Sequence, residues 1–214
     1  MENKVYTHEK YGNFNYAVHS GNRKNADEKL PMLIFLHGAG ERGDNYEKLY
    51  VHGPAKYIRN GTFETDAIVI CPQCPEGYVW NNLAPMLRDF ITDMAEEYGA
   101  DTSRISITGL SMGGYGTWEM IMFAPDLFYK AAPICGGGMY WNAERLKNIK
   151  IWAFHGTEDP IVKYEESVKM VNAVNAKGGN AKLTTCEGVA HDSWNVAYAN
   201  KSVFDWLLCQ SKSN

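Results

Sequence analysis

The sequence predicts an α/β protein built around one mostly parallel β-sheet. Short apolar runs rich in β-branched residues, typical of strands buried on both faces, recur along the chain. Segments with the spacing of amphipathic helices lie between them, and this alternation favours a parallel sheet. Polar or glycine-rich segments directly follow several predicted strands, where functional loops gather in such sheets.

Length and composition agree with one soluble globular domain. The chain has 214 residues, 45% of them hydrophobic and 21% charged, and we expect residues 1–214 to share one core. A formal net charge of −4 without a long basic run argues against nucleic acid or an anionic membrane as the main partner. No apolar run approaches the ~20 residues of a membrane span, and the N-terminus lacks a signal-peptide core. We expect a cytoplasmic protein, or a secreted one whose leader is absent from this chain; the oligomeric state stays open.

Each element has its own signal. Residues 14–19 and 181–186 alternate, whereas the other predicted strands are apolar runs. Residues 83–98 have helical spacing, with Pro85 in the first turn and Gly99 at the stop. The predicted strands are residues 14–19, 31–36, 67–71, 105–108, 131–134, 150–154 and 181–186. The other predicted helices are residues 45–51, 115–123, 165–177 and a C-terminal amphipathic segment from about 194 to 207.

One segment combines a strand, a sharp turn and the start of a helix. Its turn reads Gly109-Leu110-Ser111-Met112-Gly113. In this context the Gly-x-Ser-x-Gly pattern predicts a nucleophile elbow, in which a strained backbone lifts the serine Oγ above the sheet edge. Side chains in place of the two glycines would collide with the neighbouring strand and helix. Taken alone, the pentapeptide is equally compatible with a plain glycine-rich turn.

A candidate acid and a candidate base follow the predicted elbow. A serine hydroxyl needs a base within hydrogen-bond reach, and that base needs an orienting acid. Ser111, Asp159 and His191 occur in the required order, each just beyond a predicted strand. We expect His191 to take the proton from Ser111 and to pass it to the leaving alkoxide. Asp159 would hold the imidazole in the correct tautomer and stabilise its cation.

Other residues compete for these two roles. Asp192 adjoins His191, but adjacent side chains seldom align for a bond to Nδ1. Glu158 points away from Asp159 if the backbone is extended there. His155 follows a predicted strand and is more simply interpreted as a hydrogen-bonded loop residue. Three further histidines are interpreted as surface or structural: His8, His19 and His52.

The reaction also requires two backbone N–H donors for the developing oxyanion. Met112 follows the candidate nucleophile and starts a predicted helix, whose dipole favours negative charge. The second donor is expected in the loop after residues 31–36, which has the sequence His37-Gly38-Ala39-Gly40. We choose Ala39, although a plain glycine-rich turn also explains this segment.

The five cysteines do not suggest a disulfide framework, because they are odd in number and scattered. Cys71 and Cys74 have C-x-x-C spacing, but without a second such pair or a nearby histidine pair a zinc site is not expected. Pro72 and Pro75 make this segment a loop, whereas a redox motif opens a helix. We interpret the thiols as structural, leave the pairing of Cys71 and Cys74 open, and expect neither a metal nor an organic cofactor.

Five segments together resemble the esterase branch of the α/β-hydrolase superfamily. They are residues 37–44, 72–75, 109–114, 155–160 and 188–194. The set is similar to compact esterases related to phospholipase/carboxylesterases, polyhydroxybutyrate depolymerases and feruloyl esterases. The resemblance runs from about residue 31 to the C-terminus and implies a central sheet of about eight strands. It does not fix the substrate, because fold and catalytic groups are shared by enzymes of many specificities.

The predicted function is therefore a serine carboxylic ester hydrolase that forms an acyl-enzyme. Suitable substrates are small-molecule or carbohydrate-linked esters with short or aromatic acyl groups, such as acetyl or feruloyl groups on plant carbohydrates. No insertion between Ser111 and Asp159 is long enough for a lid domain, so we expect an open groove. Among the nearby aromatic residues, Trp80 and Trp194 are the preferred groove walls. A serine peptidase of the same fold and a non-catalytic binding module are the alternatives.

Overall fold

The computed structural model describes residues 1–10, 12–199 and 201–209, and it is built on one eight-stranded sheet. The strand order is β1-β2-β4-β3-β5-β6-β7-β8. Neighbours from β4 through β8 are parallel, while β2 pairs antiparallel with both β1 and β4. The strands are β1 (Glu2–His8), β2 (Gly12–His19), β3 (Leu30–Leu36), β4 (Ile68–Pro72), β5 (Ala100–Leu110), β6 (Lys130–Ile134), β7 (Lys150–Gly156) and β8 (Asn180–Cys186). The expected α/β-hydrolase fold with a mostly parallel sheet is confirmed.

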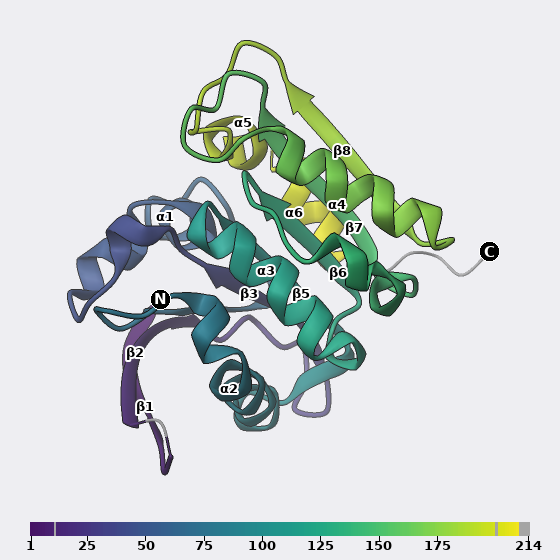
Figure 1. Cartoon of the computed structure of the whole chain (residues 1–214). Helices are drawn as coiled ribbons and strands as arrows, with labels where there is room; N and C mark the ends of the chain where they lie inside the picture. The colour runs from purple at the N-terminus through teal and green to yellow at the C-terminus, as the bar shows by residue number, and fades with distance from the viewer. Residues whose placement is uncertain (11, 200, 210–214) are drawn as a thin grey trace.

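Helices cover both faces of the sheet (Figure 1). One core cluster joins the sheet to α2 (Ala84–Glu97), α3 (Met112–Phe123) and α4 (Glu165–Ala176). The other core cluster joins it to α1 (Gly53–Arg59), α5 (Trp194–Ala199) and α6 (Ser202–Leu208). Because both faces are covered, β4 and β6 are buried along their whole length, which explains the continuous apolar runs. The 3₁₀ helices are η1 (Ala39–Glu41), η2 (Tyr46–Tyr50), η3 (Trp80–Leu83), η4 (Pro125–Leu127) and η5 (Tyr140–Leu146).

The differences from the predicted elements have local causes. Strand β1 was not predicted because it has one buried side chain, Tyr6, and therefore lacks an apolar pattern. Its backbone pairing with β2 defines it as a strand. The predicted helix 45–51 is the 3₁₀ helix η2, capped by Asn45 as expected, and α1 follows it unpredicted. The C-terminal helical segment is divided into α5 and α6. No described helix has the length and apolar character needed to cross a bilayer.

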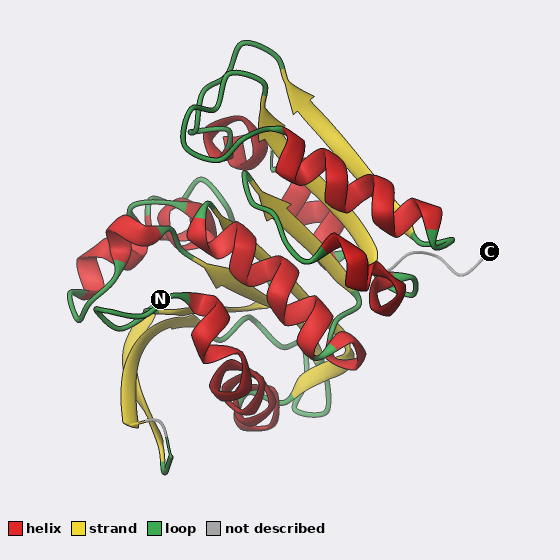
Figure 2. Ribbon diagram, in the orientation of Figure 1, coloured by secondary structure: helices red, strands yellow, loops and turns green. Residues whose placement is uncertain are grey.

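The parallel order brings the functional loops to one edge of the sheet. Strands β3 and β5 are neighbours, with Leu36 opposite Gly109, so the chain leaves both strands at the same level. The carboxyl ends of β7 and β8 are likewise in register, with Gly156 opposite Cys186. The sheet therefore directs the loops that follow these four strands to the same side, as Figure 2 shows for the yellow strands and the green loops beyond them.

Candidate active site

The turn between β5 and α3 has the strained geometry expected of an elbow. Ser111 adopts φ 54° and ψ −117°, a region that residues with a Cβ seldom occupy. Close packing on both sides maintains it. A Cβ on Gly109 would collide with the backbone of Gly113, and a Cβ on Gly113 would collide with the carbonyl of Leu36. The two glycines are therefore required by the tight approach of α3 to β3 and β5.

Ser111, His191 and Asp159 are joined by hydrogen bonds although they lie far apart in the sequence. The Ser111 Oγ is 2.8 Å from the His191 Nε2, and the His191 Nδ1 is 2.7 Å from the Asp159 Oδ2. The other carboxylate oxygen of Asp159 accepts the backbone N–H groups of Ile161 and Val162, each at 2.9 Å. The loop after β7 thus fixes the carboxylate rigidly, and the carboxylate fixes the imidazole.

The charge of Asp159 follows from these contacts. Burial by itself raises the pKa of this carboxyl, but the hydrogen bonds from His191 and from the N–H groups of Val162 and Ile161 outweigh burial and hold the pKa below its usual value. Asp159 is therefore ionised at neutral pH and accepts the Nδ1 proton of His191. The Nε2 lone pair is then directed at the Ser111 hydroxyl, which is the arrangement a general base requires.

The competing acids lie elsewhere. Asp192 is exposed and accepts a hydrogen bond from the Asn195 side chain at 3.0 Å. Glu158 is also exposed. His155 is completely buried and bonded to Ser167 and to the Val162 carbonyl, as expected of a hydrogen-bonded residue, but it lies within β7 and not in the loop after it.

The two expected oxyanion donors each lie at the start of a helix. Met112 is the first residue of α3, and the exposed Ala39 is the first residue of η1. The loop that carries Ala39 packs against the elbow, because a Cβ on Gly38 would lie only 2.9 Å from the Leu110 side chain. The Arg42 Nε donates to the Ala39 carbonyl at 3.0 Å.

Buried polar groups stabilise the loop that carries Ala39. The His37 Nε2 accepts the backbone N–H of Cys74 at 2.9 Å, and its Nδ1 donates to the Gly38 carbonyl at 2.6 Å. Burial lowers the pKa of His37 to about 4, so the ring is neutral at neutral pH and can serve both bonds. The buried Gln73 amide donates to the carbonyls of Glu41 and Asn45. The C-x-x-C segment therefore supports the loop through its backbone and through Gln73.

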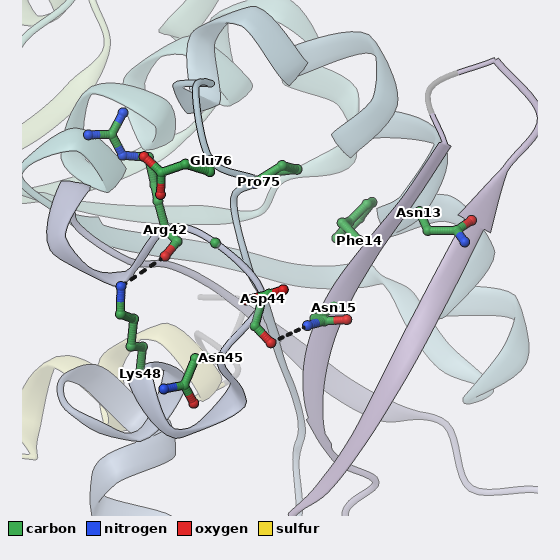
Figure 3. Close-up of a pocket in the computed structure, with 10 residues that line it drawn as sticks. Asn13, Phe14, Asn15, Arg42, Asp44, Asn45, Lys48, Pro75 and Glu76 are labelled. Atoms are coloured by element: carbon green, nitrogen blue, oxygen red, sulfur yellow. Dashed lines mark hydrogen bonds between the residues drawn. The ribbon is translucent and has the colours of Figure 1, made fainter.

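A cavity of about 460 Å³ lies on the outer side of the same loop, bordered by Arg42, Lys48 and Glu76 (Figure 3). The dashed lines in Figure 3 mark two bonds that hold its wall. The Lys48 Nζ donates to the Arg42 carbonyl at 3.1 Å, and the Asn15 Nδ2 donates to the Asp44 carbonyl at 2.8 Å. Ser111 and His191 do not line this cavity.

Trp80 does not form a wall of an open groove, which corrects the expectation from sequence. Its side chain is 1% exposed, and its indole N–H donates to the His37 carbonyl at 2.9 Å. Its ring also packs edge-on to the imidazole of His37, with centroids 4.9 Å apart. Trp80 instead braces the loop that carries Ala39.

This role of Trp80 predicts a cost in stability. Trp80→Phe leaves the buried His37 carbonyl without a donor, so we expect the free energy of unfolding to fall by about 1–3 kcal/mol, measured by urea denaturation. Trp141→Phe is the matched control, because Trp141 is 69% exposed and its replacement should change stability by about 0.5 kcal/mol or less. Equal stability of the two variants would contradict the bracing role.

Trp194 lies beside the candidate base. Its ring is edge-on to His191, with centroids 5.3 Å apart, and it also contacts the His52 ring at 5.4 Å. The indole is partly exposed and its N–H has no partner within the described chain. His52, which was given no role in the site from the sequence, therefore lies next to it through its contact with Trp194.

One group of side chains at the candidate site, which includes the candidate acid and base, has the chemistry of metal ligands. Donor atoms of Cys135, Asp159 and His191 lie within 4.8 Å of one another. Burial raises the pKa of the Cys135 thiol to about 12, so it is protonated at neutral pH, and the other two residues already bond to each other. These properties fit the serine arrangement better than a metal centre. All five cysteines are free thiols, including Cys71 and Cys74.

Three residues brace the loop of Ala39 through hydrogen bonds to its backbone, a role that was not predicted for any of them from the sequence. Arg42, Gln73 and Trp80 hold the loop of Ala39 by donating to carbonyl groups. Such bonds require only a donor of suitable reach, so no spacing rule in the sequence identifies them. The available signal is indirect: these residues belong to segments that contain many polar side chains beside buried strands.

Comparisons with known proteins agree with this architecture. The family model described as phospholipase/carboxylesterase matches residues 79–204. A bifunctional acetylxylan esterase/xylanase from Neocallimastix patriciarum is 24% identical over 154 residues, which are 70% of this chain and 22% of that protein. A poly(3-hydroxyalkanoate) depolymerase from Paucimonas lemoignei is 29% identical over 118 residues, which are 50% of this chain and 28% of that protein. The chain thus aligns with about a quarter of the length of these curated relatives.

Solved structures extend the agreement to the whole fold. A thermostable esterase is 33% identical with a TM-score of 0.85, covering 96% of this chain and 62% of that one. The feruloyl esterase module of Clostridium thermocellum, solved with sinapinate, has a TM-score of 0.73 at 17% identity and covers 100% of this chain and 90% of that one. At this identity the second likeness concerns the fold alone. With its fold, its elbow and the family match over more than half of its length, the chain belongs to the phospholipase/carboxylesterase family of α/β hydrolases.

Proposed function

We propose that this protein is a serine carboxylic ester hydrolase that acts through an acyl-enzyme. The observation that carries the proposal is the continuous chain of hydrogen bonds from the Ser111 Oγ through His191 to Asp159, at 2.8 and 2.7 Å. These distances lie within the range that nucleophile and base need for proton transfer. The family and the esterase relatives support the same reaction class.

The proposed mechanism assigns one task to each group. The Ser111 Oγ attacks the ester carbonyl carbon while its proton passes to the His191 Nε2, and Asp159 stabilises the resulting imidazolium. The carbonyl oxygen, now negative, accepts the N–H groups of Met112 and Ala39. His191 then protonates the leaving alkoxide. A water molecule that gives its proton to His191 attacks the acyl group, which releases the acid and restores the Ser111 hydroxyl.

The proposed substrates are short-acyl or aromatic-acyl esters, including acetyl or feruloyl groups on plant carbohydrates. Two observations support an acyl group of this size. The chain from Ser111 to Asp159 forms α3, η4, β6, η5 and β7 and leaves no segment that covers the site as a separate domain. Trp194 beside His191 offers an aromatic face. The acetylxylan esterase relative supports the carbohydrate-linked class.

A substrate panel tests this proposal. We expect measurable kcat/KM on p-nitrophenyl acetate and methyl ferulate, with a decline as the acyl chain lengthens from acetyl to decanoyl. A peptide amide of the same acyl group should be turned over far more slowly. Peptide turnover that exceeds ester turnover would favour a serine peptidase instead. Absence of hydrolysis of every ester and amide would favour a binding module.

A further inference from the structure

A second histidine, His155, lies close to the candidate acid Asp159 and has no role in the proposed mechanism. His155 stands near the end of β7 and is completely buried. Its Nε2 is 2.8 Å from the Val162 carbonyl and 3.3 Å from the Asp159 Oδ2. Its Nδ1 is 2.7 Å from the Ser167 Oγ on α4. Both ring nitrogens therefore have a close polar partner.

The number of protons on this ring follows from what each partner can do. The Val162 carbonyl has no proton to give, so the His155 Nε2 must carry a hydrogen. The Ser167 hydroxyl has one proton, and it donates that proton to the Gly136 carbonyl at 2.9 Å. Its oxygen can then only accept from His155, so the Nδ1 must also carry a hydrogen. A ring with hydrogen on both nitrogens is an imidazolium.

A buried cation requires a counter-charge, and the structure provides one. Among the described residues, Asp159 contributes the one carboxylate within ion-pair distance of His155. Its Oδ2 lies between two imidazoles, 2.7 Å from the His191 Nδ1 and 3.3 Å from the His155 Nε2. The same carboxylate oxygen is therefore shared by the candidate base and by the buried ring.

We propose that His155 is a buried imidazolium that shares Asp159 with His191 and so sets the pH at which His191 can act as a base. His155 is a positioning residue, since it acts through Asp159 and does not reach the reacting atoms. The inference rests on the proposed function, because His191 must be the base for the effect to be seen in turnover. A fixed positive charge near His191 opposes its protonation, which keeps the base free to a lower pH.

Several other titratable groups lie on the elements around this pair. The Tyr164 ring is edge-on to His155, with centroids 5.9 Å apart. The thiol of Cys186 lies at the end of β8 near the His155 backbone, and burial raises its pKa, as burial also does for Cys135 beyond β6. Both thiols are uncharged at neutral pH. Of the two helices packed nearby, α3 carries Tyr115 and Glu119, and α4 carries Glu165, Glu166 and Lys169.

His155→Gln tests the effect on turnover. The glutamine amide can donate to the Val162 carbonyl as the Nε2 does but carries no charge. We expect the acid limb of the kcat/KM profile for p-nitrophenyl acetate to move to higher pH by about one to two units. A merely structural role would lower the rate without moving this limb. His19→Gln is the control, since His19 also bonds a backbone carbonyl, that of Thr65 at 2.9 Å, but lies on β2.

Nuclear magnetic resonance of the wild-type protein tests the protonation itself, without any substrate. In ¹⁵N-labelled protein at neutral pH, we expect both His155 nitrogens to show directly bonded hydrogens, with the signals assigned by their loss in His155→Gln. A His155 nitrogen without a bonded hydrogen would overturn the proposal. So would an unchanged acid limb of the kcat/KM profile in a folded His155→Gln variant. The spectrum does not depend on turnover, so it tests the His155 proposal even if the protein is not an esterase. Failure of the esterase proposal would instead be seen in the ester panel.

Discussion

Ser111→Ala is expected to lower kcat for ester hydrolysis by about 10⁶-fold, because the serine proteases that use the same set of groups lose about this much when their nucleophile is removed. The variant should fold. Alanine has the same backbone requirement as serine at φ 54°, and the lost contact is the single bond to His191. The free energy of unfolding should therefore change by about 1 kcal/mol or less. The measurement is steady-state hydrolysis of p-nitrophenyl acetate beside a denaturation curve.

Ser193→Ala is the matched control for this change. Ser193 is also buried and lies only two residues from His191, but its hydroxyl interacts with the Cys135 thiol. We expect turnover by this variant to stay near that of the wild type. Retention of most of the activity in Ser111→Ala would show that the nucleophile lies elsewhere.

Asp159→Asn is expected to lower kcat by about 10⁴-fold, because it changes which ring nitrogen of His191 carries the hydrogen. The N–H groups of Ile161 and Val162 both point at the Asp159 Oδ1, so an asparagine must place its carbonyl oxygen there. Its NH₂ group then faces the His191 Nδ1 and donates to it. The Nε2 becomes the protonated nitrogen and can no longer accept the proton of Ser111.

Asp192→Asn distinguishes the two adjacent candidates. Asp192 is exposed and bonds the side chain of Asn195, and an asparagine can keep that contact. We expect kcat to stay within a few-fold of the wild type, measured on the same ester. A larger loss in Asp192→Asn than in Asp159→Asn would reverse the assignment of the acid.

The sequence allowed much of the fold to be predicted because the central strands are buried on both faces. Strands β3 and β4 are nearly continuous apolar runs, a pattern that indicates their type and their position at the centre. Strand β1 escaped prediction because its side chains are mostly exposed and its pairing with β2 is a backbone interaction. The helix α1 was missed because it is only seven residues long and begins with glycine and proline.

The candidate site was predictable where chemistry demands particular residue types in a particular order. Ser111, Asp159 and His191 satisfy such a rule, and the structure brings their side chains together. Trp80 was misplaced because an aromatic residue in a loop can line a groove or brace it from within, and only packing decides between the two. The contact of His155 with Asp159 depends on the path of the loop after β7, which the sequence does not encode as a motif.

Covalent labelling with a fluorophosphonate tests whether Ser111 is the nucleophile, because such reagents react with an activated serine and with little else. We expect one adduct per chain, located on Ser111 by peptide mass spectrometry, with loss of ester hydrolysis in proportion to labelling. Asp159→Asn should be labelled much more slowly, and Ser111→Ala not at all. An adduct on another residue, or full ester turnover by a chain fully modified at Ser111, would contradict the account.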